Sequence, residues 1–312
     1  MKSGGTKVIK IAFLHERKSY LPEIDAYVEF LNETQKFEAV IVEHVDEVDD
    51  TFDIIWKVMG IDMKRNHKAG LVHEYSTMTV GKNAKLKDFI KRTINCQPDG
   101  RVFQSRRVQD AYNFKDNVPY IYRDMGIHRS YYNVSSEKKF DFVYVGTMDP
   151  TRQLDKMLKF FKSHQDLSIV LIGTPDEQLQ ASYGNLPNVT FYGRVPNDEL
   201  PKVAAQAHYG LNYIPDVFPF NEQTSTKLIE YCALNLKIVT TSYEWINEFE
   251  QQEGGSFFKI EENMSNLSKQ ALDNFNFVTP DLKKKEWSRL LTDAGLVEFL
   301  TAIYQKNLLR EK

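Results

Sequence analysis

The feature that most constrains the fold is the alternation of short apolar strands with amphipathic helices along most of the chain. In the first half, a helix that begins near Leu21 places Ile24, Tyr27 and Leu31 on one face. The strands expected around it are Val8–Leu14, Phe37–Val42, Asp53–Val58, Ala69–His73, Val102–Phe103 and Pro119–Tyr122. Strands rich in Val and Ile that alternate with helices are typical of a parallel sheet covered on both faces.

The same alternation starts again at the apolar stretch Phe140–Gly146. The later expected strands are Ser168–Gly173, Val189–Tyr192, Tyr209–Ile214 and Lys237–Thr240, with helices at Leu154–Lys162, Asn197–Ala207 and Thr226–Leu234. A chain of 312 residues has the length of about two domains of ~150 residues each. We predict an α/β protein with two consecutive Rossmann-like doubly wound domains and the site in the cleft between them. The predicted domains are residues 1–135 and 136–285, followed by a helical segment, residues 286–312, that is broken near Gly295 and could pack back on the first domain.

Charge and cysteine content exclude several classes of protein. The 40 basic and 43 acidic side chains give a net charge of −3, which argues against a nucleic-acid-binding protein. Cys96 and Cys232 are the only cysteines and neither lies in a CxxC pair, so a reducing, cytosolic compartment fits best. The sequence contains no apolar run long enough to cross a membrane. The histidines outside the strand ends show no metal-ligand spacing, and we expect no metal site.

A basic block lies in the first half of the chain. Residues 56–129 hold 15 basic and 7 acidic side chains. At its centre, a helix is expected over Lys82–Ile94, with apolar residues turned inside. Its basic residues are Lys82, Lys85, Lys87, Lys91 and Arg92, and its apolar residues are Leu86, Phe89 and Ile90. The helix could be a solvated surface, or it could lie on an anionic membrane surface.

The most informative motif joins a strand that ends at Ile214 to the helix that begins near Thr226. Hydroxyl residues Thr224, Ser225 and Thr226 occupy positions that suit a helix N-cap. The free N–H groups of a helix start also suit a phosphate. Lys227 lies in the first turn, where a cation is disfavoured by the helix dipole, and a bound anion would explain it. Capping alone is the alternative interpretation.

At these residues the chain resembles a known family. Glu222 and Glu230 have the E-x7-E spacing of GT-B glycosyltransferases, especially the retaining family-four group. The stretch Ser225–Tyr231 is similar to that group's S-x-K-L-x-E-Y. Further similar pieces follow the family's order: Tyr144-Val145-Gly146-Thr147 with Arg152, Val189–Pro196 with Glu199 and Leu200, and Met125–His128 in place of N-G-V-D. The resemblance covers about residues 120–241 and extends to the first domain only by pattern.

The resemblance implies a role for each matching residue. Glu230 would hold the ribose hydroxyls and Glu222 would contact the donor sugar. Backbone N–H groups at Thr224–Thr226 would bind a diphosphate, which Arg152 and Lys227 would neutralise. The other residues expected in the nucleotide-sugar site are Gly146, Thr147, Arg194, Val195 and Gln223, with the loop at Val195 beside the base. Gln223-Thr224-Ser225 replaces the family's glycine-rich stretch, and its side chains could take over backbone contacts.

The first domain would then be the acceptor side. His73 ends a predicted strand, and some family members place a histidine there near the donor sugar; alternatively, backbone groups satisfy it. Glu74 is a general-base candidate if the enzyme inverts, or otherwise a surface carboxylate.

The implied activity is transfer of a sugar from a nucleotide diphosphate sugar, of the UDP or GDP type, to a hydroxyl of a glycan or lipid-linked precursor. The family default is retention without a metal or other cofactor, and the sequence contains no DxD motif. A cytoplasmic enzyme is expected, with peripheral placement at the inner face of the membrane if the basic helix docks there. Two alternatives stay open: a nucleotide-sugar epimerase on the same fold, and a non-catalytic partner of another transferase. Paired carboxylates of the glycosidase kind fit less well, because they need no phosphate site.

Overall fold

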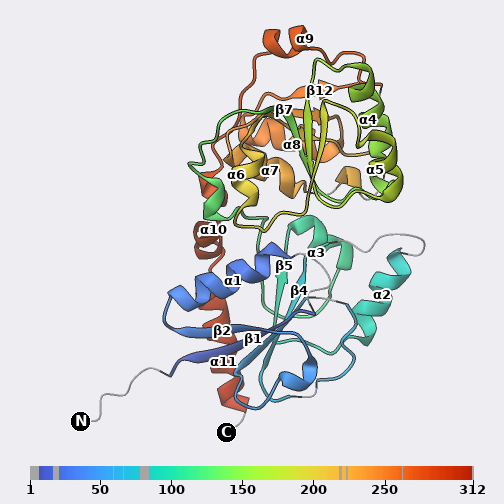
Figure 1. The fold of residues 1–312 in the computed structure, drawn as a ribbon. Coiled ribbons are helices and arrows are strands. Elements are labelled where there is room, and N and C mark those ends of the chain that lie inside the picture. The colour runs from blue at the N-terminus through green and yellow to red at the C-terminus, as the bar shows by residue number, and fades with distance from the viewer. Residues whose placement is uncertain are drawn as a thin grey trace. The chain divides into compact units, whose positions relative to one another are not determined.

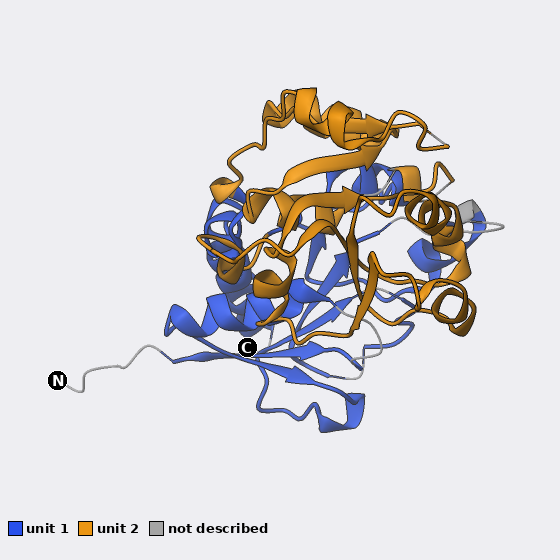
Figure 2. Ribbon diagram, turned by 45° about the horizontal axis from the view of Figure 1, so that its top comes forward, with its two compact units in different colours: residues 1–126, 285–312 blue, residues 127–284 orange. Residues whose placement is uncertain are grey.

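The computed structural model describes residues 7–16, 21–58, 60–65, 67–77, 84–217, 220–222, 224–261 and 263–310. The chain divides into two compact units, coloured blue and orange in Figure 2. Unit 1 consists of residues 1–126 and 285–312, and unit 2 of residues 127–284. The C-terminal helical segment is therefore part of unit 1. Across the described ranges, no helix combines the length and the apolar character that a bilayer crossing requires.

Unit 1 is built on a six-stranded parallel sheet with the order β2-β1-β3-β4-β5-β6. Its strands are β1 (Ile9–Leu14), β2 (Phe37–Val42), β3 (Ile54–Val58), β4 (Gly70–Tyr75), β5 (Gly100–Phe103) and β6 (Tyr120–Tyr122). Each expected strand of the first half is present. This agreement confirms the α/β prediction for the first half, because alternating apolar runs define the buried strands of a parallel sheet.

Helices cover both faces of this sheet (Figure 1). They are α1 (Pro22–Glu33), α2 (Ala84–Ile94), α3 (Arg106–Tyr112), α10 (Trp287–Asp293) and α11 (Leu296–Arg310), with a short 3₁₀ turn at Val45–Glu47. Another 3₁₀ turn, Lys283–Lys285, lies where the chain returns from unit 2 to unit 1. On one face, α1, α10 and α11 share a core with Phe13 and Trp56. On the other face, α3 packs around Tyr75 and Phe103.

Helix α2 differs from its prediction. Leu86, Phe89 and Ile90 were expected inside, but they are 55%, 51% and 37% exposed. The helix contacts α3 near its C-terminal end, where the Arg92 guanidinium donates to the carbonyls of Tyr112 and Asn113, each at 3.3 Å. The amphipathic pattern thus predicted the helix correctly but not which face is covered. Lys82 and the side chain of Lys85 lie outside the described residues.

Unit 2 repeats the architecture with a six-stranded parallel sheet of order β12-β11-β10-β7-β8-β9. Its strands are β7 (Phe140–Val145), β8 (Ile169–Ile172), β9 (Val189–Gly193), β10 (Ala207–Asn212), β11 (Lys237–Thr241) and β12 (Phe258–Ile260). Two such sheets flanked by helices confirm the predicted pair of Rossmann-like domains of the GT-B fold.

The helices of unit 2 also lie on both faces of their sheet (Figure 1). They are α4 (Leu154–Ser163), α5 (Glu177–Tyr183), α6 (Leu200–Ala204), α7 (Thr226–Ala233), α8 (Glu244–Glu253) and α9 (Lys269–Asn274), with 3₁₀ turns at Arg129–Tyr131, Pro150–Arg152 and Phe220–Glu222. Helices α4, α5 and α9 share a core with the side chains of Phe142 and Leu171. Helix α6 is shorter than the predicted Asn197–Ala207, because Pro201 lies in its first turn and β10 already begins at Ala207.

The chain leaves unit 1 and re-enters it at two neighbouring points of that unit. Asp124 Oδ2 lies 2.5 Å from Lys285 Nζ. A Cβ atom at Gly126 would lie 2.3 Å from the ring of Trp287, so only glycine allows this close packing. The two segments are therefore fastened to each other within unit 1.

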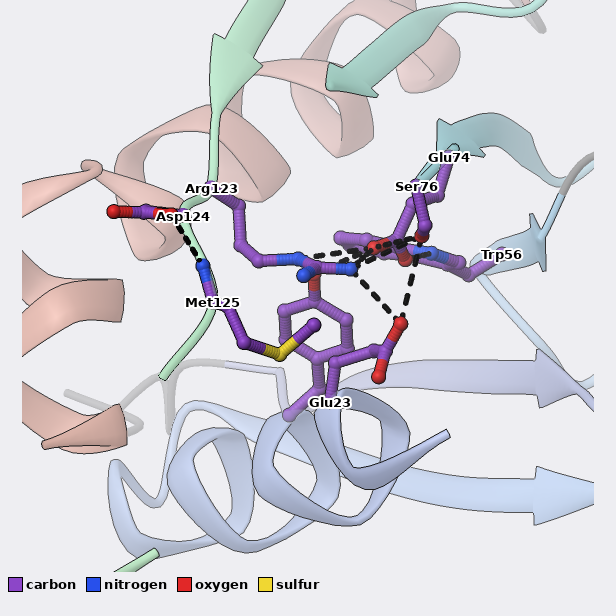
Figure 3. A network of polar contacts seen from close by, with 8 residues as sticks. Glu23, Trp56, Glu74, Ser76, Arg123, Asp124 and Met125 are labelled. Atoms are coloured by element: carbon purple, nitrogen blue, oxygen red, sulfur yellow. Dashed lines mark hydrogen bonds and ion pairs between the residues drawn. The ribbon is translucent and has the colours of Figure 1, made fainter. Parts of the chain in front are cut away.

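A buried ionic network lies next to this crossing (Figure 3). The Arg123 guanidinium has no exposed surface; its Nη2 donates to Glu23 at 3.1 Å and forms an ion pair with Glu74. Trp56 Nε1 donates to the second oxygen of Glu74 at 2.8 Å, and Arg123 Nε donates to the Tyr27 hydroxyl at 2.7 Å. Glu74 is thus fully buried, which corrects its interpretation as a surface carboxylate.

Candidate functional site

A cavity of ≈ 300 Å³ lies in unit 2, where β7 and β10 end and α7 begins. Its size is at the lower end of the range for small-molecule sites. The lining combines backbone, hydroxyl, aromatic and cationic groups: Tyr144, Val145, Gly146, Thr147, Arg152, Leu211, Asn212, Tyr213, Ile214, Phe220, Thr224, Ser225, Thr226, Lys227 and Tyr231. Ligands of open α/β sheets bind at the carboxyl ends of the strands, and this cavity is at that edge.

Helix α7 is held against the sheet by Tyr231. The backbone N–H of Val145 donates to the Tyr231 hydroxyl at 2.8 Å. Gly210 in β10 lies directly under the ring, because an added Cβ atom would be 2.5 Å from it. The missing side chain at Gly210 therefore lets α7 approach β10 closely, and this approach fixes the position of the helix start.

A second network, buried under the helix start, orients its cap. The Ser225 hydroxyl accepts from the N–H of Leu228 at 3.3 Å, as an N-cap should, and donates to Asn212 Oδ1 at 2.7 Å. Asn212 Nδ2 donates in turn to Thr240 and Tyr243, both at 2.9 Å. Since Asn212, Ser225 and Thr240 are buried, the network sets the cap from three separate elements.

Two cations belong to the site. Lys227 Nζ lies 2.7 Å from Glu230 Oε2, with exposed side-chain fractions of 25% and 8%. The Arg152 guanidinium stacks over the Phe220 ring at 4.4 Å from its centroid. Both cations line the cavity, and a helix start adds free N–H groups and a partial positive charge. This combination suits an anionic ligand such as a diphosphate.

The structure brings together seven of the residues predicted for the site. Gly146, Thr147, Arg152, Thr224, Ser225, Thr226 and Lys227 all line the cavity. Glu230 is buried beside it through its pair with Lys227. Gln223 lies outside the described residues, and so does the side chain of Glu222, whose backbone ends a 3₁₀ turn.

Three predicted residues are not among those that line this cavity. Arg194 and Val195 follow β9, which is the edge strand two positions from β7, and they do not line it. His73 belongs to unit 1, has no exposed surface, and its Nε2 lies 3.1 Å from Asp62 Oδ2. Burial lowers the pKa of His73.

Sequence reasoning assigned no role in the site to several residues that shape the cavity: Tyr144, Asn212, Tyr213, Phe220 and Tyr231. Asn212 carried a usable signal, because a buried amide at the end of an apolar strand needs partners. A second cavity, of ≈ 680 Å³, lies in the same unit and shares Tyr213 and Ile214 with the first. Among its lining residues are Lys156 and Lys259, from α4 and β12.

Comparison with known proteins finds a family model that matches part of the chain, within unit 2. Residues 132–275 match the model of the family described as glycosyl transferases group 1. The matched range includes every residue that lines the cavity of ≈ 300 Å³. None of the curated proteins matches the sequence.

Solved structures resemble the chain over nearly its whole length. AviGT4, a glycosyltransferase involved in avilamycin A biosynthesis, has a TM-score of 0.58 at 13% identity, covering 96% of this chain and 98% of its own. Alr3699/HepE of Anabaena, solved with UDP and glucose, has a TM-score of 0.58 at 11% identity, covering 96% and 98%. A UDP-N-acetylglucosamine 2-epimerase has a TM-score of 0.51 at 13% identity, covering 97% of each chain. At such identities the likeness establishes the fold.

Proposed function

We propose that this chain, which has the GT-B fold, is a glycosyltransferase that transfers a sugar from a UDP-type nucleotide sugar to a hydroxyl of a glycan or lipid-linked precursor. The observation that carries the proposal is the cavity of unit 2, where Arg152, Lys227 and the start of α7 face the same space. Two cations and free N–H groups match the charge of a diphosphate. The similar structure from Anabaena was solved with UDP and glucose, which favours UDP over GDP.

The remaining predicted residues would complete donor binding. Glu230 would accept the ribose hydroxyls, for which its buried position next to Lys227 is suitable. Glu222 would contact the donor sugar, because it ends the turn that begins at the cavity residue Phe220. Gly146 and Thr147 would approach the donor through the backbone, Gln223 would extend the diphosphate site, and Arg194 and Val195 would border the base.

We propose a retaining transfer without a metal ion or other cofactor. The bond between the anomeric carbon and the diphosphate breaks, and a bond from that carbon to the acceptor oxygen forms on the same face. A diphosphate oxygen takes the acceptor proton. Negative charge grows on the diphosphate as it leaves, and Arg152 and Lys227 would stabilise it there more strongly than in the bound donor.

For the acceptor, the surface of α2 supports a lipid-linked precursor at a membrane. Leu86, Phe89 and Ile90 are exposed next to Lys87 and Lys91, and a helix that is both apolar and basic is suited to an anionic interface. The enzyme would then work in the cytoplasm, reversibly attached at the inner face of the membrane.

The epimerase is the second candidate, because one of the similar folds is a UDP-N-acetylglucosamine 2-epimerase. The two activities differ in their products. When no acceptor is present, a transferase slowly hydrolyses its donor and releases UDP and the free sugar. An epimerase instead inverts the configuration at one carbon of the sugar. A new epimer, detected by NMR of the sugar, would replace the transferase proposal.

The test begins with a thermal-shift screen of UDP, GDP, TDP and their sugars. A ligand at 100 times its Kd should stabilise the folded protein by ~2.7 kcal/mol. With the donor identified, Arg152→Ala and Lys227→Ala should lower kcat more than they raise KM. The control is Lys162→Ala, an exposed lysine of α4 outside the cavity. No stabilisation by any nucleotide, or a change in KM alone, would overturn the proposed roles.

A further inference from the structure

Three side chains of different chemistry converge in unit 1, far from one another in sequence. Asp62 follows β3, His73 lies in β4 and Cys96 follows α2. One ligand atom from each lies within 4.8 Å of the others. We propose that these three residues bind a divalent transition-metal ion of the Zn²⁺ type. The proposal concerns a different unit from the nucleotide cavity and does not depend on the proposed function.

The two distances from the Asp62 carboxylate fit a tetrahedral ion. Zn²⁺ holds oxygen and nitrogen at about 2.0 Å and thiolate sulfur at about 2.3 Å, which separates O from N by about 3.3 Å and O from S by about 3.5 Å. His73 Nε2 lies 3.1 Å, and Cys96 Sγ 3.5 Å, from Asp62 Oδ2. Carboxylate, imidazole and thiolate together suit Zn²⁺ better than Mg²⁺ or Ca²⁺, which prefer oxygen ligands.

Backbone contacts hold two of the ligands in place before any ion arrives. The N–H of Cys96 donates to the Asp62 carbonyl at 2.7 Å. The N–H of Asp62 donates to the side-chain oxygen of Asn95 at 2.8 Å. His73 is fixed by the central strand β4, which pairs with β3 and β5. The segments that carry the three ligands are thus already held close together, so binding of an ion would need little rearrangement.

Lys57 supplies the outer shell of this site. Its Nζ lies 2.8 Å from Asp62 Oδ1 and leaves Oδ2, the oxygen nearest His73 and Cys96, for the ion. Hydrogen-bonded carboxylates are typical of the surroundings of metal sites. The carboxylate and the thiolate would bring two negative charges to the cation, and the Asp62 carboxylate is shared with the Lys57 ammonium.

Three protein ligands leave one position of a tetrahedron, which water would fill. The bound ion would tie the segments around Asp62 and Cys96 to the sheet.

The test uses Co²⁺ as a spectroscopic substitute for Zn²⁺ in the full-length protein, after removal of metals with a chelator. We expect saturation at one equivalent, the strong visible bands of tetrahedral Co²⁺ and a thiolate-to-cobalt charge-transfer band, all displaced by Zn²⁺. The nearly isosteric Cys96→Ser should remove the charge-transfer band. Cys232→Ser, which changes the other cysteine, buried in unit 2, should leave it intact.

Affinity gives a second measurement. Asp62→Asn and His73→Gln should lower Zn²⁺ affinity, measured against a chromophoric chelator, by at least the 10–100-fold that loss of an outer-shell partner costs. UDP binding should not change in these variants. The wild-type protein decides the matter even if a variant fails to fold: no saturable Co²⁺ spectrum would overturn the proposal. A charge-transfer band that survives Cys96→Ser would overturn it as well.

Discussion

Lys227 stands at the end of α7 where a cation opposes the helix dipole, and Glu230 one turn later compensates it at 2.7 Å. An arriving diphosphate would supply a second negative partner for the ammonium. We expect this exchange to free part of the Glu230 carboxylate for the ribose. Lys227 and Glu230, one turn apart on one short helix, would thus contact the phosphates and the ribose of the same nucleotide.

Glu230→Ala should therefore weaken nucleotide binding. Loss of a carboxylate that accepts hydrogen bonds from ribose should cost ~1.5–3 kcal/mol, roughly ten- to a hundredfold in Kd. Calorimetric titration with the nucleotide found in the screen measures this directly. Glu248→Ala, which removes an exposed carboxylate of α8, is the matched control. An unchanged Kd in the Glu230 variant would remove the ribose assignment.

The Arg123 network leads to a prediction about pH. One guanidinium faces two buried carboxylates, and burial raises the pKa of Glu23. The Glu23 carboxyl group therefore holds its proton more tightly in the folded protein than in the unfolded chain. The resulting stability is fully present below the unfolded pKa of about 4.3 and is lost as pH rises through the folded pKa.

Glu23→Gln keeps the shape and an acceptor oxygen but cannot ionise. The variant should match the wild-type free energy of unfolding near pH 4 and exceed it increasingly as the pH rises toward 8. Urea unfolding across that range makes the comparison, with Glu33→Gln at the exposed end of α1 as the control. A variant less stable than wild type at every pH would contradict the assignment of the raised pKa.

Among the secondary-structure elements, the position of helix α7 against strand β10 depends on Gly210. Gly210→Ala would put a Cβ atom 2.5 Å from the Tyr231 ring, which cannot move away without losing its hydrogen bond to Val145. We expect a loss of about 1–3 kcal/mol of stability and weaker nucleotide binding. Gly60→Ala is the control, because its added methyl group meets nothing within 4 Å. Full stability of the Gly210 variant would show that the close approach is not required.

Local signals explain which elements the sequence could predict. The strands β1 to β4 and β7 to β11 were predictable because runs of Val, Ile and Phe mark buried strands without reference to the rest of the chain. Helices α3, α5, α8 and α9 and strand β12 were not predicted. All of them except the ten-residue α8 have seven residues or fewer, and segments so short carry little periodicity. The exposed face of α2 was predicted wrongly, because a pattern shows that a face is apolar but not what covers it.

The same distinction applies to the candidate site. Ser225 and Lys227 could be found because a cap and a charge in the first helical turn are local features. The link from Asn212 to Thr240 joins positions 28 residues apart, and only the order of β10 and β11 brings them together. Asp62, His73 and Cys96 likewise meet only through the fold, with no spacing that a metal motif would show.

For the whole molecule, charge is distributed unevenly although it nearly cancels overall. Residues 56–129 hold 15 basic and 7 acidic side chains, and α2 lies among them. Its exposed Leu86, Phe89 and Ile90, together with Ile94 at 38% exposure, add an apolar component that a purely solvated helix would not need. Basic residues supply attraction to anionic lipid and apolar residues supply insertion. Both are present on this helix.

Replacing Lys82, Lys85, Lys87 and Lys91 with Gln should therefore abolish sedimentation with anionic vesicles. Each basic residue near an anionic surface contributes ~1 kcal/mol, and the attraction fades with salt as the Debye length shortens. Arg92 is kept, because its guanidinium donates to carbonyls next to α3. The control replaces Lys156, Lys159 and Lys162 of α4. Nucleotide binding should not change in the α2 variant, since the cavity belongs to unit 2. If the wild-type protein bound neutral and anionic vesicles equally, or neither, the basic block would be a solvated surface and a lipid-linked acceptor would lose its support.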